Sequence, residues 1–426
     1  MSKQIKWGCI QPLTGGMYLG AQEAIGHPAE WIISYKGLNN VVKDKDGNIT
    51  NCTNEYNLTQ YLKKHNCMPP YYIFNERKMF DINFDYKKVD LVTEDGEHVD
   101  PDYNDIDLVL AVPVCSGLST STICDSHVKY ARNCNMLNIT YYTVAVIKPK
   151  VYIFENAPTL MGTKGDSIRF ELQQLAEDYG YTIAYYKTDT HLHHNCQKRP
   201  RTFILFFRKD TDEATVPVMN FENAPVSIEE FLSHIPADAS QQDVLSPSVW
   251  IHTPIRYMNY IYGKNWRDNV NGNLLDVILK TPDATKKFLD WVHETGTDEE
   301  IRRFDKYIGH IEKKRAEGKG WWVLSSKYIH DYVPACMHKN IFAMVHVTED
   351  RLYTIREWLT MMGMPYDFEM QGRYDLIFQK IGQNVPAGTA KYITNEALRY
   401  INGEAELVNA NVMFYDNIKQ KIIKIE

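Results

Sequence analysis

The sequence predicts an α/β fold in which a doubly wound, mostly parallel sheet is interrupted by a smaller inserted domain. Two observations lead to this prediction. Up to about residue 207, short apolar runs alternate with helical patterns, which is the rhythm of strands joined by crossover helices. From about Arg208 to Lys339 this rhythm stops, and turn clusters mix with charged helical stretches. We therefore expect a first domain over residues 1–207, an inserted domain over 208–344, and a segment over 345–426 that returns to complete the first domain.

Five apolar runs of strand length support the predicted sheet. Between the third and the fourth run, residues 167–179 are expected to form an amphipathic helix, because Ile168, Leu172, Leu175 and Ala176 recur at helical spacing. The five strand candidates are residues 31–35, 108–112, 151–154, 182–186 and 202–207.

The composition argues against several classes of protein. The chain of 426 residues has no run of about 18 apolar residues and no apolar leader before Trp7. We therefore expect a soluble protein of the cytoplasm, in a bacterium or in the host of a virus, with no membrane contact. Its eight cysteines include no C-x-x-C pair, which argues against a disulfide framework or a zinc ribbon. The net charge of −7 does not mark a nucleic-acid binder, although a local basic face can still meet phosphates.

Two short motifs follow strand candidates directly, at the position where α/β folds place their ligands. Residues 113–119 (Pro-Val-Cys-Ser-Gly-Leu-Ser) follow the second candidate, and Cys115 is a possible nucleophile. Taken alone, a buried loop cysteine is the more frequent explanation. Residues 155–158 (Glu-Asn-Ala-Pro) follow the third candidate. A partly apolar pocket can raise the pKa of a carboxyl group such as that of Glu155 and let it donate a proton, but an acid at this position could equally cap a helix.

Two further motifs complete the set. Residues 197–201 (Gln-Lys-Arg-Pro-Arg) stand immediately before the last strand candidate, and an extended chain puts Arg199 and Arg201 on the same side. Near the end, Arg356-Glu357 and a Gly-Met-Pro segment precede residues 382–386 (Gly-Gln-Asn-Val-Pro). A turn that leads into a helix after a long insertion indicates that the chain returns to its first domain.

In this order and spacing, the four motifs resemble those of the cytosine-C5 DNA methyltransferase family, over roughly residues 7–207 and 345–395. That family has a Pro-Cys-x-x-x-Ser loop, a Glu-Asn-Val acid, a Gln-x-Arg-x-Arg pair, an Arg-Glu…Gly-x-Pro segment and a Gly-Asn-x-Val-Pro turn. The resemblance implies a Rossmann-like catalytic domain, with the inserted domain recognising the target. It also implies S-adenosylmethionine as cofactor and duplex DNA as partner, bound by a monomer without an obligate protein partner.

The resemblance also assigns roles to residues. Cys115 would add to C6 of a flipped-out cytosine and Glu155 would protonate N3, while Arg201, with Arg199, would stabilise the charge that develops. Ser119 would bind the target phosphate. Asn156 and Gln197 complete the expected substrate-binding set. The expected cofactor-binding residues are Leu13, Thr14, Gly15, Gly16, Tyr35, Lys36, Pro113, Gln383, Asn384 and Val385.

The cofactor end departs from the family pattern. The family opens with Phe-x-Gly-x-Gly-Gly, but here Gln11 stands for the Phe and Leu13 for the first Gly. Lys36 lies in the region where the family carries the acid that binds the ribose hydroxyls, and the acid that contacts adenine is Asp81 or Asp85. Smaller departures are Val114 in place of the Pro before the nucleophile and Gln383 in place of the Asn of the late turn.

Several functions therefore stay open beside ordinary methyl transfer. Lys36 would suit a more anionic analogue of S-adenosylmethionine, although a lysine that faces solvent is the simpler explanation. A catalytically silent DNA-binding relative is a second alternative, but such a binder need not keep Cys115 and Glu155 together. RNA is a third possible substrate, although the large inserted domain favours duplex DNA.

Two other features have mainly structural interpretations. The basic residues between Arg302 and Lys319, which run into Trp321-Trp322, are interleaved with acids. Such a run is usually a solvated helix face, and contact with DNA is the alternative. The cluster of His191, His193, His194 and Cys196 is packed too tightly to converge on a metal without a bent loop, so we expect a surface loop and no metal.

Overall fold

A computed structural model of the chain describes residues 4–114, 118, 126–210, 213–235, 249–320, 327–329, 331–336 and 344–426, with the side chains of α4 described from residue 133. The chain divides into two compact units, Met1–Pro225 with Leu359–Glu426, and Val226–Trp358. Residues 208–225, which the sequence pattern places in the inserted domain, belong to the first unit. There β13 (Thr215–Pro217) pairs with β17 (Leu407–Asn409).

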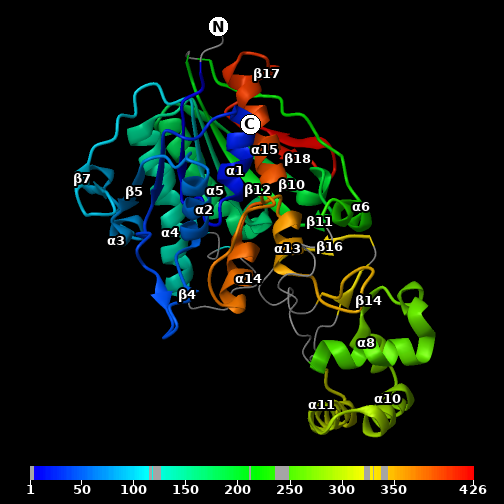
Figure 1. Cartoon of the computed structure of the whole chain (residues 1–426). Helices are drawn as coiled ribbons and strands as arrows, with labels where there is room; N and C mark the ends of the chain where they lie inside the picture. Colours follow the sequence, from blue (N-terminus) through cyan, green and yellow to red (C-terminus); the bar gives the residue numbers. More distant parts are fainter. Residues whose placement is uncertain are drawn as a thin grey trace. The chain divides into compact units, whose positions relative to one another are not determined.

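The described part of the first unit is built on an eleven-stranded sheet in the order β19-β18-β10-β12-β9-β8-β1-β2-β5-β6-β7 (Figure 1). The five neighbours from β5 to β9 run parallel, and β12 is antiparallel to both β9 and β10. This mostly parallel sheet confirms the predicted fold class and all five strand candidates. The strands are β1 (Trp7–Ile10), β2 (Trp31–Ser34), β5 (Tyr71–Phe74), β6 (Leu91–Val92), β7 (His98–Val99), β8 (Leu108–Ala111), β9 (Val151–Asn156), β10 (Tyr181–Asp189), β12 (Pro200–Arg208), β18 (Val412–Asp416) and β19 (Lys421–Ile425).

Helices cover both faces of the sheet (Figure 1). On one face, α1 (Gly16–Ile25), α2 (Asn54–Lys64) and α15 (Ala387–Ile401) bury apolar side chains against alternate residues of the strands. On the other, α4 (Ser126–Tyr142) and the predicted helix, α5 (Asp166–Asp178), do the same. The central strands β1, β2, β8 and β9 are buried along their whole length, as expected for strands that are covered on both faces.

Shorter elements complete the first unit. The insertion after β2 contains the hairpin of β3 (Val42–Lys43) and β4 (Ile49–Asn51) before α2 begins. Next to β5 is the single turn of α3 (Glu76–Met79), and β11 (Gln197–Lys198) precedes β12. In the returning segment, α13 (Ile355–Met361) spans the boundary between the two units and α14 (Tyr374–Gln383) leads into the turn before α15.

The second unit is mainly helical in its described residues. Its apolar core is contributed by α8 (Val249–Tyr262), α9 (Leu274–Ile278), α10 (Pro282–Thr295) and α11 (Asp298–Ala316). The remaining elements are α6 (Ile228–Ser233), β14 (Gly272–Asn273), β15 (Lys327–Tyr328) and β16 (Val333–Pro334). Across the described residues of both units, no helix has the length and apolar character that crossing a bilayer requires.

Glu357, from the predicted Arg-Glu pair, is a buried structural acid in the second unit. It closes a capping box at the start of α13, where the Thr354 N–H donates to Glu357 Oε2 at 2.7 Å and the Glu357 N–H donates to Thr354 Oγ1 at 3.1 Å. The Arg351 guanidinium donates to both carboxylate oxygens, at 2.7 and 2.9 Å. Burial opposes the ionised form, but the hydrogen bonds from Arg351 and His346 outweigh it and hold the pKa of Glu357 at about 2.

Replacing Glu357 with glutamine is expected to lower the free energy of unfolding at pH 7 by about 3 kcal/mol, given about 1.4 kcal/mol per unit of pKa depression. Because the folded-state pKa is depressed, this contribution is complete above the ordinary carboxyl pKa and is lost as pH falls toward 2. Urea unfolding at pH 7 and at pH 4 measures both effects. Glu349→Gln, which removes an exposed partner of the same arginine, is the matched control and should cost much less. Equal losses for the two variants would contradict the assignment.

Candidate active site and cofactor pocket

The candidate site lies at the carboxyl edge of the parallel strands. Strand β2 lies on one side of β1 and β8 on the other, so the crossovers diverge there and leave a crevice outside the strand ends. The loops that follow β1, β2, β5, β8 and β9 therefore share one edge of the sheet. Every motif of the first domain that the sequence analysis selects lies in one of these loops or at the start of the antiparallel strand β12.

The loop between β1 and α1 is fastened to the late turn of the chain. The hydroxyl of the buried Thr14 donates to the carbonyl of Lys380 at 3.0 Å, and the Gly16 N–H donates to Asn384 Oδ1 at 2.8 Å. A Cβ on Gly16 would lie only 1.8 Å from the Val385 carbonyl oxygen, so the absence of a side chain permits this approach. The structure therefore brings together Thr14, Gly16, Asn384 and Val385 from opposite ends of the chain, and their role in binding the cofactor stays a prediction.

The same loop contains unusual backbone geometry. Leu13 has a φ of 53° and Gln11 a φ of 51°, in the left-handed region that favours glycine. Leu13 therefore keeps the conformation that suits the glycine it replaces. The Gln11 side chain is completely buried, and neither polar atom of its amide has a hydrogen-bond partner among the described residues. Buried amides are normally satisfied, so this amide is a group that a polar ligand could complete.

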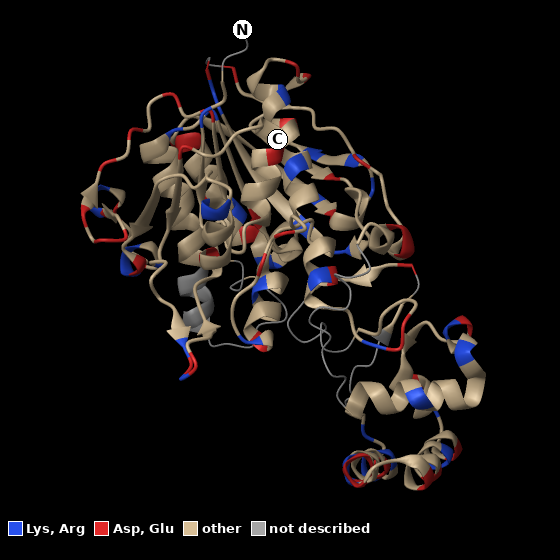
Figure 2. Ribbon diagram, in the orientation of Figure 1, with Lys and Arg blue, Asp and Glu red and all other residues tan. Residues whose placement is uncertain are grey.

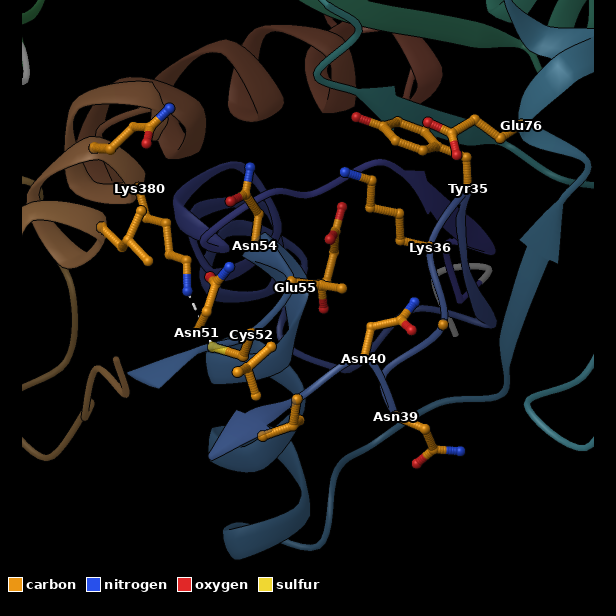
Figure 3. A pocket seen from close by; sticks show the side chains of 16 residues that line it. Tyr35, Lys36, Asn39, Asn40, Asn51, Cys52, Asn54, Glu55, Glu76 and Lys380 are labelled. Carbon is orange, nitrogen blue, oxygen red and sulfur yellow. Dashed lines mark hydrogen bonds between the residues drawn. The ribbon is translucent and has the colours of Figure 1, made fainter. Parts of the chain in front are cut away.

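A cavity of about 700 Å³ opens at the end of β2 (Figure 3). Lys380, which accepts the hydrogen bond from Thr14, is one of the residues that line it. Tyr35 and Lys36, both expected from the sequence, line it, and their side chains are joined there by those of Glu55 from α2 and Lys380 from α14. Its volume falls in the range of small-molecule sites. The cavity is polar: Lys380, itself buried, donates to Cys52 Sγ at 3.0 Å.

Glu55 is the residue that sequence reasoning missed. Its side chain is buried, and it accepts a hydrogen bond from Ser34 Oγ at 2.9 Å, at the end of β2. Burial raises the pKa of Glu55, while the hydrogen bond from Ser34 and the charges of Lys36 and Lys380 act against that rise. An acid therefore does stand at the end of β2, supplied by α2, which begins some twenty residues later. The one sequence feature that could have indicated Glu55 is that it is an acidic residue in the first turn of a helix.

A second missed acid is Glu76, which lines the same cavity directly after β5 and Asn75. Asp81 and Asp85, the two candidates from the sequence, lie outside the lining of this cavity. Asp85 instead accepts the N–H of Lys87 and pairs with Lys88. The signal for Glu76 was its place immediately after an apolar run at 71–74, which the strand assignment did not include.

Glu155 and Arg201 meet at the other side of this edge. Glu155 is the penultimate residue of β9 and only 4% exposed. Glu155 is paired with Phe203 of β12. Arg201, two residues before Phe203 and on the same face of the strand, reaches diagonally across, and its Nε contacts Glu155 Oε1 at 2.6 Å. The structure thus joins the predicted acid to the second arginine of the predicted pair.

Arg199 lies elsewhere. It is 2% exposed, and its Nη2 donates to the carbonyls of Gly382 and Asn384, at 2.8 and 2.9 Å. This side chain therefore holds the late turn against the strand edge. Gln197 is also completely buried, near Met362, and its N–H donates to Asn195 Oδ1.

Cys115 and Ser119 lie outside the described residues, but the flanks of their loop are described. The Val114 N–H donates to Asn135 Oδ1 at 3.0 Å, and Thr159 Oγ1 donates to the Leu118 carbonyl at 2.6 Å. Asn156 is buried; its Oδ1 accepts the Ala157 N–H at 2.8 Å and its amide points at the Met136 sulfur. Asn156 therefore shapes the loop after β9.

The histidine cluster is only partly the expected surface loop: His194 is exposed, whereas His193 and Cys196 are buried. His193 is 2% exposed, with Nε2 2.6 Å from Thr188 Oγ1 and Nδ1 2.7 Å from Glu222 Oε2. His194 also contacts Glu222, and His191 contacts Asp189. Among the described residues, no group of three potential ligands has the geometry of a metal site.

Comparisons with known proteins identify the family of the chain and bear on its fold. The family model for C-5 cytosine-specific DNA methylase matches residues 72–399, more than half of the chain. The type II methyltransferase M.Bpa9945I of Bacillus paralicheniformis is 21% identical over 336 residues, which cover 70% of this chain and 71% of that protein. The structure of the Entamoeba histolytica methyltransferase EhMeth superposes with a TM-score of 0.53 at 9% identity, covering 95% of this chain and 99% of that one. A protein encoded within an Escherichia coli prophage gives 0.50 at 17% identity, over 94% of this chain and 100% of its own. At these identities, the two structures support the fold alone.

Proposed function

Because the chain belongs to the C-5 cytosine-specific DNA methylase family, we propose that it transfers a methyl group to C5 of a cytosine in duplex DNA through a covalent adduct at Cys115. The observation that carries this proposal is the pairing of Glu155 with Arg201 at the end of β9. Strand β8, which leads into Cys115, is the parallel neighbour of β9. The predicted nucleophile and the predicted acid therefore follow adjacent strand ends.

The chemistry follows from what each residue can do. C5 of cytosine is a weak nucleophile, so the Cys115 thiolate adds to C6, and the electron pair of the C5–C6 bond is displaced toward C5. As negative charge builds on the ring, Glu155 supplies a proton at N3. Arg201 fixes the direction of that carboxyl group and stabilises the charge on the base. Once the methyl group is bonded to C5, the C5 proton leaves to water and its electron pair restores the C5–C6 double bond. The S–C6 bond breaks, which returns the thiolate, and N3 gives its proton back to Glu155. These atoms are inaccessible inside a duplex, so the base must be flipped out of the stack.

Arg199 serves this reaction by positioning. Its guanidinium donates hydrogen bonds to two carbonyls of the late turn. Asn384 of the same turn accepts a hydrogen bond from the loop after β1. We therefore assign charge stabilisation to Arg201 and assign Arg199 to the alignment of the cofactor loop.

The residues of the cavity fit S-adenosylmethionine, which supplies the methyl group when bound. Gln11 is not among the residues that line the cavity, but its unsatisfied amide in the loop after β1 offers a further donor and acceptor. Glu55 and Glu76 offer acceptors to hydroxyl and amino groups. We propose Glu55 as the acid that receives the ribose hydroxyls, in place of the acid that the family carries after its second strand.

This assignment also bears on the alternative of a more anionic cofactor, which rests on Lys36. The charge of Lys36 acts on Glu55 within the same cavity. A carboxylate of the protein itself therefore balances the lysine, and ordinary S-adenosylmethionine remains the proposed donor.

Replacing Glu55 with glutamine is expected to weaken the binding of S-adenosylhomocysteine roughly 10- to 100-fold, because a hydrogen bond to a charged group contributes about 1.5–3 kcal/mol. Isothermal titration calorimetry measures this without turnover. Ribose hydroxyls donate more strongly to the ionised carboxylate than to the neutral acid, and burial raises the pKa of Glu55. Wild-type affinity should therefore rise with pH just above the ordinary carboxyl range, whereas the variant should not follow. Glu97→Gln, at an exposed turn, is the control; equal affinities for both variants would refute the assignment.

Nucleoside mass spectrometry tests the proposed function itself. DNA from cells that express the protein should contain 5-methylcytosine, and cells that express Cys115→Ala should lack it. A modified cytosine heavier than 5-methylcytosine that depends on Cys115 would show that a group larger than methyl is transferred, and would favour the altered cofactor. Modified cytosine confined to RNA would overturn the choice of substrate. If no modified base forms on a panel of duplexes supplied with S-adenosylmethionine in vitro, the protein is a DNA-binding relative without transferase activity.

A further inference from the structure

Helix α11 of the second unit carries an unbalanced row of cations. Successive residues of a helix are about 100° apart around its axis, so Arg302, Lys306, Gly309 and Lys313 fall within an arc of about 60°. The core face, with Phe304, Ile308 and Ile311, lies on the opposite side. All four members of the row are exposed. We call these four residues the α11 row.

Most of the other charges of α11 are paired within the protein. The exception among the carboxylates is Asp298, which lies four residues before Arg302 and has no ion pair among the described residues. Figure 2 shows both signs of charge along this helix, and ion pairs account for most of the carboxylates. The described residues show no ion pair for Arg302, Lys306 or Lys313, whose side chains stay available. The pairs are Arg303–Glu299, Arg315–Glu312, His293–Asp305, Arg256–Glu300, and Lys314 and Lys319 with Glu317.

Gly309 interrupts the row at its centre. A glycine inside a helix costs roughly 0.5–1 kcal/mol relative to alanine. A Cβ at this position would have no atom within 4 Å, so packing inside the described protein does not require the glycine. A bare backbone between cations lets a partner approach the helix more closely than side chains would allow.

We propose that the α11 row binds the phosphate backbone of duplex DNA, independently of sequence. The choice of DNA rests on the proposed function. At a rise of 1.5 Å per residue, the row extends about 16 Å. A duplex carries one negative charge per about 1.7 Å of its axis and presents a dense anionic surface to a row of this length. In a chain of net charge −7, such contacts must come from a local row, and they would fix the position of the second unit on DNA without reading bases.

The test compares two triple variants of the full chain. Arg302→Gln/Lys306→Gln/Lys313→Gln removes the row. Arg303→Gln/Lys314→Gln/Lys319→Gln removes three cations that are paired with acids and makes the same change in net charge. Fluorescence anisotropy with a duplex of about 30 base pairs, at several NaCl concentrations, gives the slope of log K against log [salt].

The row variant should lose affinity and reduce the magnitude of the slope by about 2–3, because each phosphate contact contributes about 0.9; the control variant should leave the slope nearly unchanged. Equal slopes for both variants would overturn the proposal. So would a loss of binding to vesicles that contain anionic lipid with no loss on DNA. Gly309→Ala should raise the melting temperature yet weaken DNA binding, and unchanged binding would refute the close approach.

This experiment can fail separately from the proposed function. Covalent trapping on 5-fluorocytosine reports Cys115 chemistry, whereas the salt slope reports phosphate contacts. If the protein traps DNA normally but the row variant and the control variant show equal salt slopes, the proposed transferase function is kept and the proposal for the α11 row is rejected. A chain that never modifies DNA can still show the slope difference, as a binder.

Discussion

Replacing Cys115 with alanine is expected to abolish the covalent complex that the protein forms with a duplex carrying 5-fluorocytosine. Fluorine at C5 cannot leave as a proton does, so the adduct between the thiolate and C6 cannot collapse and the protein stays attached. Without the thiol, no bond to C6 forms, and the rate of methyl transfer should fall by a factor on the order of 10⁴ or more. Denaturing electrophoresis of the protein with labelled duplex measures the trapped complex.

Two controls separate this chemistry from binding. Cys115→Ala should bind the duplex in native conditions as well as the wild type, since the substitution removes only the sulfur. Cys67→Ala, which alters a half-buried free thiol in the same unit, should still be trapped. A covalent complex that persists in Cys115→Ala would assign the nucleophile to another residue and overturn the mechanism.

Replacing Glu155 with glutamine is expected to reduce the single-turnover rate by about 10²–10⁴, the usual contribution of a positioned general acid. The shape of the side chain is kept and an oxygen remains to accept from Arg201, so the substitution removes the negative charge of the carboxylate while the contact can persist. The variant loses the proton that N3 requires. Rapid-quench measurements with saturating S-adenosylmethionine give the rate, and Glu177→Gln on the exposed face of α5 is the control.

Arg201 supplies a second test of the same pair. If Arg201 acts mainly through Glu155, the double variant Glu155→Gln/Arg201→Lys should be little slower than the slower single variant, because groups that act as one unit are not additive. Fully multiplicative losses would show that Arg201 acts on the base independently. A loss below tenfold in Glu155→Gln would remove Glu155 from the proton transfer.

The parts of the site that the sequence predicted are those placed directly at strand ends. Glu155 is adjacent to an apolar run and Arg201 immediately precedes another, so the periodicity of the strands was enough to put both at one edge. The pairing of β12 with β9 then set their contact. Local sequence patterns are sufficient here because both residues lie on adjacent strands. Once the register of those two strands is set, the contact between the side chains follows.

Glu55 and Lys380 could not be found in this way. Glu55 reaches the end of β2 only because the insertion at 38–53 folds back, and a one-dimensional pattern does not show where a helix packs. The last residues of the chain give a similar case. They form β18 and β19, which extend the sheet beyond β10, but β19 is short and exposed and so lacks the apolar pattern that indicates a strand. The burial of His193 could not be predicted either, because polar residues usually mark a surface. Hydrogen bonds to Thr188 and Glu222 satisfy its ring nitrogens and allow it to be buried.

The hydrogen bond from Thr14 to Lys380 joins residues 366 positions apart, and this separation has a consequence for biosynthesis. A ribosome that adds about 5–20 residues per second needs roughly 20–70 s between the two. During that interval, β1 and α1 have left the exit tunnel while the residues that anchor their loop have not yet been made. Release of α14 is thus the event that completes the cofactor loop, and a nascent chain that stops before it should have no methyl-transfer activity.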